Sequence, residues 1–326
     1  MLEVKDLKVY FNTETNPIKA VDGVSFEVHR GKTCALVGES GCGKSVSALS
    51  LARLLPEQSV RYAGGSVMFK GRSVQEMDTH ELRSLRGAGI AYIFQEPASS
   101  LNPVFKVGYQ IAEALKIHRP DTESHSEVVR LLRQVGISDP QSCAGMYPFQ
   151  LSGGMQQRVM IAMALACEPE FLVADEPTTA LDVTIQAQIL DLLAEIRDQF
   201  NMGILLITHN LGLVAGAAHY LNVMYAGRIV ESGKVPETLE TPLHPYTKAL
   251  LAAVPQLSAG EGRMNAIKGN VPNPANLPTG CKFHPRCPLA DEKCRLVEPV
   301  LEQIESDNGH LESSESCRWI RCHYWK

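Results

Sequence analysis

A glycine-rich octapeptide, Gly38 to Ser45, constrains the fold of this chain more than any other feature. It fits the pattern G-x-x-x-x-G-K-[ST] at every fixed position. The apolar residues 34–37 before it favour a strand, and residues 46–55 after it carry apolar side chains at helical spacing. The octapeptide is therefore predicted to join a strand of an α/β sheet to a helix packed on that sheet.

Such a loop has a specific use in chemistry. Its backbone N–H groups can close around phosphate oxygens, and the N-terminus of the following helix adds partial positive charge. Lys44 is placed to reach the β- and γ-phosphates of a nucleotide, and the Ser45 hydroxyl to bind Mg²⁺. The candidate nucleotide-binding residues of the loop are Gly38, Ser40, Gly41, Cys42, Gly43, Lys44, Ser45 and Val46.

Two acidic residues and a histidine follow later apolar segments. Asp175 and Glu176 end the segment 171–174, and His209 ends the segment 204–208. Both segments lack alternation, which suits parallel strands covered on both faces, and the carboxyl edge of such a sheet binds ligands. We therefore expect Asp175 to hold Mg²⁺ through a water molecule and Glu176 to polarise the water that attacks the γ-phosphorus. His209 is expected to contact the γ-phosphate and hold Glu176 in position.

Composition limits the remaining possibilities. The chain has 326 residues, which suggests about two domains, and its formal net charge of -5 without a basic block predicts no nucleic-acid partner. Its first residues show no secretory signal, and no apolar run approaches the length of a membrane span. Any role at a membrane is therefore expected to come through partners.

The pattern along the chain predicts two domains. The segment 1–36 is rich in predicted strands, including an alternating strand at 20–28, and a helical insertion is expected at about residues 99–160. Prolines and cysteines become frequent after residue 235. We therefore place one domain at 1–235, with a mostly parallel sheet and an antiparallel β section, and a small Cys/Pro-rich extension at 236–326.

A second glycine-rich turn, Leu151 to Gln156, opens another apolar helix. Together with the features above, it makes the chain resemble the ATP-binding subunits of ABC transporters over residues 1 to about 235. Gly38 to Ser45 matches the Walker A motif, Leu151 to Gln156 the signature, and 171–176 the Walker B motif. No motif is broken, which implies a subunit that binds ATP with Mg²⁺ and hydrolyses ATP.

The resemblance also assigns roles to residues outside these three motifs. It implies that Gln95 is the Q-loop residue and contacts Mg²⁺, and that Phe11, with Tyr10 as the alternative, stacks on adenine. Residues 180–182 match the D-loop, which contributes Asp182. In that family, the signature contacts ATP held by the opposite subunit, so the nucleotide lies at a dimer interface. The matching signature residues are Ser152 and Gly154.

Further segments are similar to the ATPases of dipeptide and oligopeptide importers. They are 94–97, 100–103, His244 to Leu251 and Cys281 to Pro288, and they extend the resemblance over nearly the whole chain. The resemblance implies a second, paralogous ABC ATPase subunit, two transmembrane permease subunits and an extracytoplasmic substrate-binding protein. It also implies a peripheral position on the cytoplasmic face of the inner membrane, with 102–110 as the surface that contacts a permease. Relatives of this kind import peptides, nickel or some glycosides.

The cysteines of the extension form a separate group. Cys281, Cys287 and Cys294 are followed by Cys317 and Cys322, and five cysteines so close together in a cytosolic chain suggest metal rather than disulfides. Their spacing alone does not choose between zinc and iron–sulfur. The resemblance to the importer ATPases implies a [4Fe-4S] cluster with Cys281, Cys287, Cys294 and Cys322 as ligands, Cys317 being the rival for the last position.

Two other functions compete with transport. A soluble ABC-type ATPase working on DNA or ribosomes would carry a long coiled coil or two fused cassettes, and the sequence shows neither. A metal-cluster sensor with a vestigial ATPase would have a damaged site, whereas Glu176 and His209 are both present. The sequence therefore favours a transporter ATPase.

Overall fold

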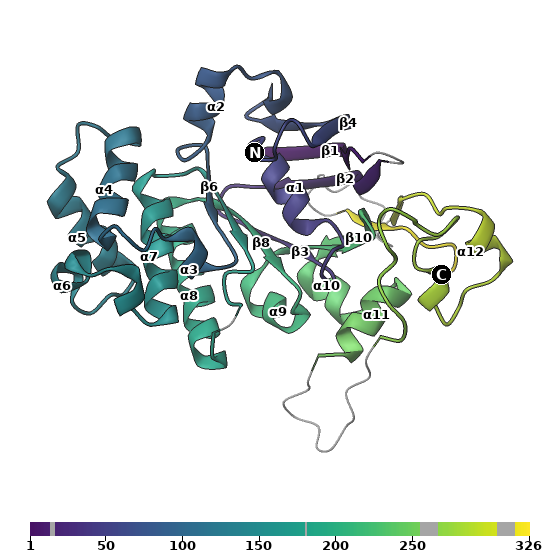
Figure 1. Ribbon diagram of the computed structural model, residues 1–326. Coiled ribbons are helices and arrows are strands. Elements are labelled where there is room, and N and C mark those ends of the chain that lie inside the picture. Colours follow the sequence, from purple (N-terminus) through teal and green to yellow (C-terminus); the bar gives the residue numbers. More distant parts are fainter. Residues whose placement is uncertain (14–16, 180, 255–266, 305–316) are drawn as a thin grey trace. The chain divides into compact units, whose positions relative to one another are not determined.

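The computed structural model describes residues 1–13, 17–179, 181–254, 267–304 and 317–326 (Figure 1). The chain forms two compact units, each assembled from separate stretches of sequence. The first unit comprises Met1–Glu27, Thr33–Gln75 and Thr208–Lys326, and the second comprises Val28–Lys32 and Glu76–Ile207. Residue 235 falls inside the first unit, and the domain boundary placed there stays a prediction. In the described part of the chain, no helix is both long and apolar enough to cross a membrane.

The first unit contains an antiparallel sheet with the strand order β2-β1-β4-β5. Val24, Phe26 and Val28 are buried while Ser25 is exposed, which confirms the half-buried strand predicted there. The four strands are β1 (Leu2–Phe11), β2 (Ile18–Val28), β4 (Val60–Phe69) and β5 (Arg72–Ser73), and the 3₁₀ helix η1 (Val74–Glu76) follows them.

A second group of strands in this unit has the order β11-β12-β10-β9-β3. The pair β3–β9 is parallel, and the other pairs are antiparallel. Strands β11 and β12 come from the C-terminal segment. The end of the chain therefore adds two strands to the sheet that contains β3, the strand before the phosphate loop. The strands are β3 (Thr33–Val37), β9 (Tyr220–Tyr225), β10 (Arg228–Lys234), β11 (Glu302–Ile304) and β12 (Arg318–Ile320).

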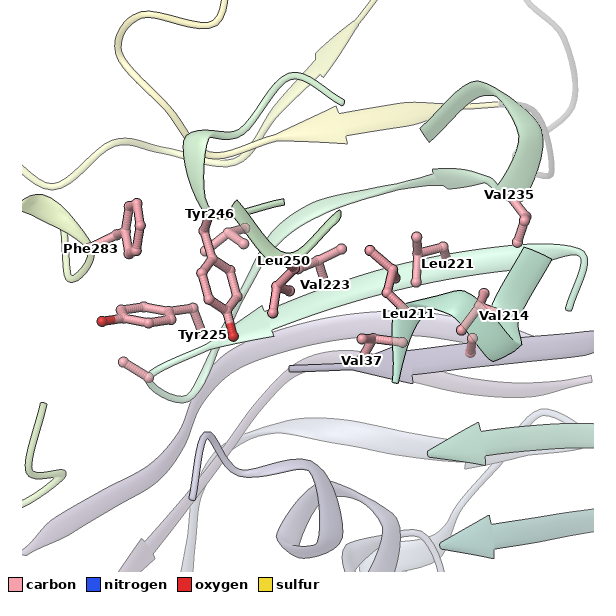
Figure 2. Close-up of a cluster of buried hydrophobic side chains, with 13 residues drawn as sticks. Val37, Leu211, Val214, Leu221, Val223, Tyr225, Val235, Tyr246, Leu250 and Phe283 are labelled. Carbon is pink, nitrogen blue, oxygen red and sulfur yellow. The ribbon is translucent and has the colours of Figure 1, made fainter. Parts of the chain in front are cut away.

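One hydrophobic core cluster of the first unit lies against β3, β9 and β10 (Figure 2). Val37, Val223 and Leu211 are fully or almost fully buried in it. At one end of the cluster the rings of Tyr225, Tyr246 and Phe283 gather, and Phe283 lies in the segment 236–326 that is predicted to form a C-terminal extension. The helices of the unit are α1 (Lys44–Ser50), η3 (Leu211–Leu213), α9 (Val214–Ala217), α10 (Val235–Glu240), α11 (Pro245–Ala252), η4 (His284–Arg286) and α12 (Glu292–Leu296).

Helix α1 is shorter than its sequence pattern predicts. The apolar spacing predicts a helix over 46–55, but α1 ends at Ser50. Arg53 has a φ of 50°, in the left-handed region that ends a right-handed helix. The side chains of Leu51 and Ala52 are nevertheless buried. The apolar spacing therefore predicted correctly which side chains are buried, but it placed the end of the helix too late.

The second unit holds a parallel sheet and the helices of the predicted insertion. Strands β6, β7 and β8 pair in parallel and carry almost wholly buried side chains, as their apolar sequences predict. Helices α4, α5, α6 and α7 pack together (Figure 1). The elements are α2 (Thr79–Leu85), β6 (Ile90–Ile93), α3 (Pro97–Ser100), α4 (Val107–His118), α5 (Ser124–Gln134), α6 (Pro140–Gly145), η2 (Pro148–Gln150), α7 (Gly153–Ala166), β7 (Phe171–Asp175), α8 (Val183–Phe200) and β8 (Gly203–Thr208). Mixed sheets, an antiparallel section and a helical insertion confirm the predicted fold class.

Candidate functional site

The phosphate loop lies between β3 and α1, as the sequence predicts. Lys44 is 5% exposed, and its ammonium group donates hydrogen bonds to the carbonyl oxygens of Gly38 at 2.8 Å and Glu39 at 3.1 Å. These bonds close the loop on itself. The lysine charge is thereby held beside the backbone that would surround a phosphate group.

Two glycines of the loop are required by close backbone approaches. A Cβ atom at Gly38 would meet the carbonyl oxygen of Met224 at 2.2 Å, and one at Gly43 would meet that of Ala20 at 2.3 Å. Gly43 also has a φ of 106°, which L-residues rarely adopt. Ser40, Gly41 and Ser45 are exposed, while Val46 is half-buried. The loop thus presents backbone and a hydroxyl to solvent, the chemistry that phosphate and Mg²⁺ need.

Cys42 occupies the loop without offering a reactive thiol. Its side chain is 1% exposed, and burial raises the pKa of the thiol above its ordinary value. Its carbonyl oxygen accepts a hydrogen bond from the N–H of Gly227 at 2.9 Å. The residue therefore supports the loop through its backbone and by filling space.

The two aromatic candidates for adenine stacking have different surroundings. The Tyr10 hydroxyl donates a 2.6 Å hydrogen bond to Asp22, and burial with this bond raises the pKa of Tyr10 to about 12. Phe11, the last residue of β1, is half-buried. The tyrosine is thus tied to a structural partner, while the assignment of Phe11 to adenine stays a prediction.

Gln95 and Glu176 meet in the second unit. The Gln95 side-chain amide donates a hydrogen bond to the Glu176 carboxylate at 3.0 Å. The Thr179 hydroxyl donates to the same carboxylate oxygen, also at 3.0 Å. Glu176 has a φ of 48°, a strained backbone conformation for a residue with a side chain. The structure therefore joins two predicted catalytic residues around one carboxylate.

Asp175 and His209 lie where their strands end. Asp175 is the last residue of β7, and Glu176 follows it directly. Glu176 is tied to β8, because its backbone N–H donates a hydrogen bond to the carbonyl oxygen of Ile207 at 2.9 Å. His209 is exposed and follows β8. Both residues therefore occupy the strand ends that the sequence predicts.

The signature turn opens helix α7. Ser152 is the N-cap, its hydroxyl accepts from the Met155 N–H at 3.4 Å, and its side chain is exposed. A Cβ at Gly154 would lie 3.2 Å from the Ile185 side chain, so the turn lies close to α8. Asp182 occupies the N-cap position of α8 without a side-chain cap hydrogen bond and is exposed, whereas Ala180 lies outside the described residues. Exposed Ser152 and Asp182 leave polar groups available for a second molecule.

The predicted iron–sulfur cluster is contradicted. In the ranges that the structure describes, no group of three or more His, Cys, Asp or Glu side chains could hold a metal ion. This finding overturns the [4Fe-4S] assignment and gives no support to zinc. All nine cysteines are free thiols. Cys281, Cys287, Cys294 and Cys322 do line one cavity, while Cys317 accepts a hydrogen bond from Gln303 at 2.9 Å.

Burial also affects the charge state of these thiols. Burial raises the pKa of Cys281 to about 11, and it also raises the pKa values of Cys287, Cys294 and Cys322. Metals bind the thiolate, whereas burial here favours the protonated thiol. Spacing along the chain had grouped the cysteines correctly around one cavity, but it did not establish a ligand set.

Sequence reasoning missed the residues that hold the site from outside the motifs. Thr179 was not singled out, although a hydroxyl residue three positions after Glu176 in a turn is a local signal for such a bond. Glu39 pairs with Arg286 across 247 positions, with Nη1–Oε2 and Nη2–Oε1 distances of 2.7 Å and 3.0 Å. Arg286 stands inside a segment that the sequence had singled out, but no local pattern predicts so distant a partner.

Sequence comparison identifies two families in the chain. The family described as "ABC transporter" matches residues 21–179, which include the phosphate loop, Gln95 and Glu176. The family described as "Oligopeptide/dipeptide transporter, C-terminal region" matches residues 230–294. The second match reaches into the segment that contains Tyr246, Phe283 and Arg286.

Curated relatives match almost the entire chain. The dipeptide transport ATP-binding protein DppD of Haemophilus influenzae is 47% identical over 325 residues, which cover 99% of this chain and 95% of that protein. DppD of Escherichia coli is 47% identical over 326 residues, covering 99% of this chain and 96% of that protein. The oligopeptide transport ATP-binding protein AppD of Bacillus subtilis is 48% identical over 303 residues, covering 92% of each chain.

Solved structures confirm the fold. A dimer of the ATP-binding cassette MJ0796 with ADP and Pi has a TM-score of 0.64 at 24% identity, over 72% of this chain and 99% of that one. The cbiO1 protein of Clostridium perfringens, part of the transporter complex cbiONQ, has a TM-score of 0.62 at 26% identity, over 73% of this chain and 90% of that one.

Proposed function

The chain belongs to the family of ABC transporter ATP-binding proteins, and from this premise we propose that it powers the import of dipeptides or oligopeptides. As an ABC ATPase it binds and hydrolyses ATP. The names of the relatives and the match of residues 230–294 to an oligopeptide/dipeptide family support peptide as the cargo. Nothing among them favours nickel, and nothing favours a soluble role on DNA or ribosomes.

The hydrogen bond between Gln95 and Glu176 is the observation that carries the catalytic proposal. Glu176 follows a buried strand, and its carboxylate is oriented by Gln95 and Thr179. A carboxylate oriented in this way can accept a proton from an attacking water molecule. We assign it as the general base, with His209 at the neighbouring strand end as the residue that contacts the γ-phosphate.

The phosphate loop would bind the nucleotide through its backbone and Lys44. Ser45, Gln95 and Asp175 offer the hydroxyl, amide and carboxylate oxygens that Mg²⁺ prefers, so their chemistry fits this ion. When bound, Mg²⁺ neutralises charge on the phosphates. Phe11 is proposed to stack on adenine.

The signature residues support a nucleotide held between two subunits. Ser152 and Asp182 are exposed, and Gly154 leaves the turn without a side chain. We propose that Ser152, Gly154 and Asp182 contact ATP bound by a second, paralogous ATPase subunit. The match to a dimeric cassette supports the fold that such pairing needs.

An exposed apolar surface on the helical part of the second unit supports a permease partner. Val104, Phe105 and Tyr109 are 69%, 44% and 54% exposed, and the last two rings stack 5.0 Å apart. Gln110 fixes this turn, because its amide donates to the carbonyls of Asn102 and Phe105 at 3.0 Å each. A rigid apolar surface of this kind is typical of a protein interface.

We therefore propose that residues 102–110 contact one of two transmembrane permease subunits, which receive cargo from an extracytoplasmic binding protein. The chain would then lie peripherally on the cytoplasmic face of the inner membrane. These partners account for a transport role in a chain whose described helices cannot cross a membrane themselves.

Replacing the proposed base tests the catalytic assignment. Glu176→Gln keeps the size of the side chain but removes its basicity, so ATP hydrolysis should fall by about 10²- to 10⁴-fold. ATP affinity should stay close to wild type, and size-exclusion chromatography with the partner subunit should show a trapped ATP-bound dimer. Asp191→Asn, an exposed carboxylate on α8, is the matched control and should hydrolyse ATP normally. Wild-type turnover by Glu176→Gln would refute the assignment.

A further inference from the structure

The C-terminal extension reaches the phosphate loop through one arginine. Arg286, at the end of η4, is 4% exposed in its side chain, and its guanidinium binds the Glu39 carboxylate in a bidentate pair. Glu39 is the second residue of the loop that begins at Gly38. A bidentate guanidinium–carboxylate pair fixes orientation as well as distance.

A second residue from the C-terminal segment holds the same loop position. The backbone N–H of Glu39 donates to the hydroxyl of Tyr246 at 2.9 Å, and Tyr246 is fully buried in α11. The carbonyl of Glu39 accepts from Lys44 at 3.1 Å and from the N–H of Cys42 at 3.3 Å. The backbone N–H, the carbonyl and the carboxylate of Glu39 therefore all form hydrogen bonds. The N–H and the carboxylate bond to residues beyond position 235.

The two anchoring residues are rigid because an aromatic cluster surrounds them. The rings of Tyr225, Tyr246 and Phe283 make pairwise contacts, with centroids 4.7 Å, 5.2 Å and 5.3 Å apart (Figure 2). The Arg286 guanidinium lies 5.8 Å from the Tyr225 ring and 6.0 Å from the Phe283 ring. Its Nε donates to the carbonyl of Lys268 at 3.0 Å. Such packing leaves the guanidinium little freedom to leave Glu39.

We propose that the C-terminal extension holds the phosphate loop in its nucleotide-binding conformation, with Arg286 and Tyr246 acting as positioning residues through Glu39. The inference rests on ATP binding by the loop, as given above. It assigns a use to the segments 244–251 and 281–288, which nucleotide chemistry alone leaves unexplained. A loop set in advance around its phosphate loses less conformational freedom on binding, so the extension is expected to tighten ATP binding.

A matched ion pair separates positioning of the loop from simple docking of the extension. Arg318, on β12, also joins the extension to the cassette, because it donates to the buried Glu231 on β10 at 2.7 Å. Glu231 is not part of the loop. Arg286→Met and Arg318→Met therefore each remove one such pair, and only the first touches the loop.

The test titrates full-length protein with a fluorescent ATP analogue and Mg²⁺, and also records kcat, KM and the melting temperature. We expect Arg286→Met to raise the Kd at least tenfold, with KM rising more than kcat falls. Arg318→Met should leave the Kd within about twofold of wild type, even if its melting temperature falls as far as that of Arg286→Met. Equal Kd values for the two variants would overturn the proposal.

A milder pair of variants covers the case in which Arg286→Met does not fold. Tyr246→Phe removes only the hydroxyl that accepts from Glu39, and Tyr324→Phe removes a hydroxyl of the C-terminal segment that donates to Asp291 and not to the loop. Kd should rise about threefold or more for Tyr246→Phe alone, at an unchanged melting temperature. Wild-type affinity in Tyr246→Phe would overturn the proposal. If the wild-type chain itself failed to bind the analogue, the nucleotide-binding function would fail instead.

Discussion

The phosphate loop and the turn after β7 both carry ATPase chemistry, yet they are held in different ways. The loop is fixed by buried atoms: Lys44 bonds to its backbone, and Gly38 lies against the backbone of Met224. The turn is fixed at an edge by two side chains, Gln95 and Thr179, on one carboxylate. The phosphate loop therefore holds its conformation before a nucleotide binds. The position of the Glu176 side chain instead depends on a few hydrogen bonds that can be broken and replaced by others.

Among changes to how the two regions are held, the largest effect on ATP binding should come from a methyl group in the loop. Gly38→Ala would place a Cβ 2.2 Å from a backbone oxygen, which cannot move as a flexible side chain can. Overpacking of this kind costs about 1–3 kcal/mol, which corresponds to about 5- to 150-fold in ATP affinity if the cost falls on the binding conformation. Isothermal titration with ATP and Mg²⁺ measures the loss.

Gly41→Ala is the control for that prediction. Gly41 has a φ of 81° but no atom within 4 Å of an added Cβ, so the substitution strains the backbone without a collision. We expect a smaller loss, about 1–2 kcal/mol from the left-handed conformation. If Gly41→Ala weakened binding as strongly as Gly38→Ala, close packing would not be what sets the loop.

An effect of comparable size should appear at the turn, but in turnover rather than in binding. Gln95→Ala and Thr179→Val each remove one hydrogen bond to the Glu176 carboxylate. A single bond of this kind to a charged group is worth about 1.5–3 kcal/mol, so kcat should fall about tenfold or more while the Kd for ATP changes little in Thr179→Val.

Thr184→Val, at an exposed position on α8, provides the control for Thr179→Val and should keep wild-type kcat. The left-handed φ of Glu176 means that the turn stores backbone strain, which these bonds help to maintain. A drop in ATP affinity with unchanged kcat in Thr179→Val would erase the contrast between the two regions.

The sequence predicted the parts of both regions that depend on local pattern. Lys44 opens the helix that follows one apolar strand, and Glu176 directly follows another; such strands and helix starts can be recognised from a few residues. Partners such as Arg286 could not be predicted, because tertiary packing alone brings residue 286 to residue 39. The metal prediction was wrong for a related reason: spacing placed four cysteines around a cavity, but their burial and arrangement decide whether they bind metal.

Acid should weaken the part of the first unit that supports the loop, and this is the smallest expected effect. His244 is almost fully buried, and its ring accepts from the Tyr246 N–H at 3.0 Å, which caps α11. Burial lowers the pKa of His244 to about 3, against 6.5 for an exposed histidine. Below pH 6.5 the unfolded chain therefore takes up a proton that the folded chain refuses. Stability from this residue is complete above pH 6.5 and decreases as the pH falls towards 3.

Between pH 7.5 and pH 5.5, this linkage should cost the first unit about 1 kcal/mol of unfolding free energy. Both tryptophans, Trp319 and Trp325, lie in the C-terminal segment, so urea unfolding followed by tryptophan fluorescence reports on the unit that holds the loop. His244→Asn keeps an acceptor for the helix cap but does not titrate, and it should lose most of this pH dependence. His80→Asn, at an exposed position in the second unit, should retain it. A pH dependence unchanged in His244→Asn would show that the support of the loop does not depend on a neutral His244.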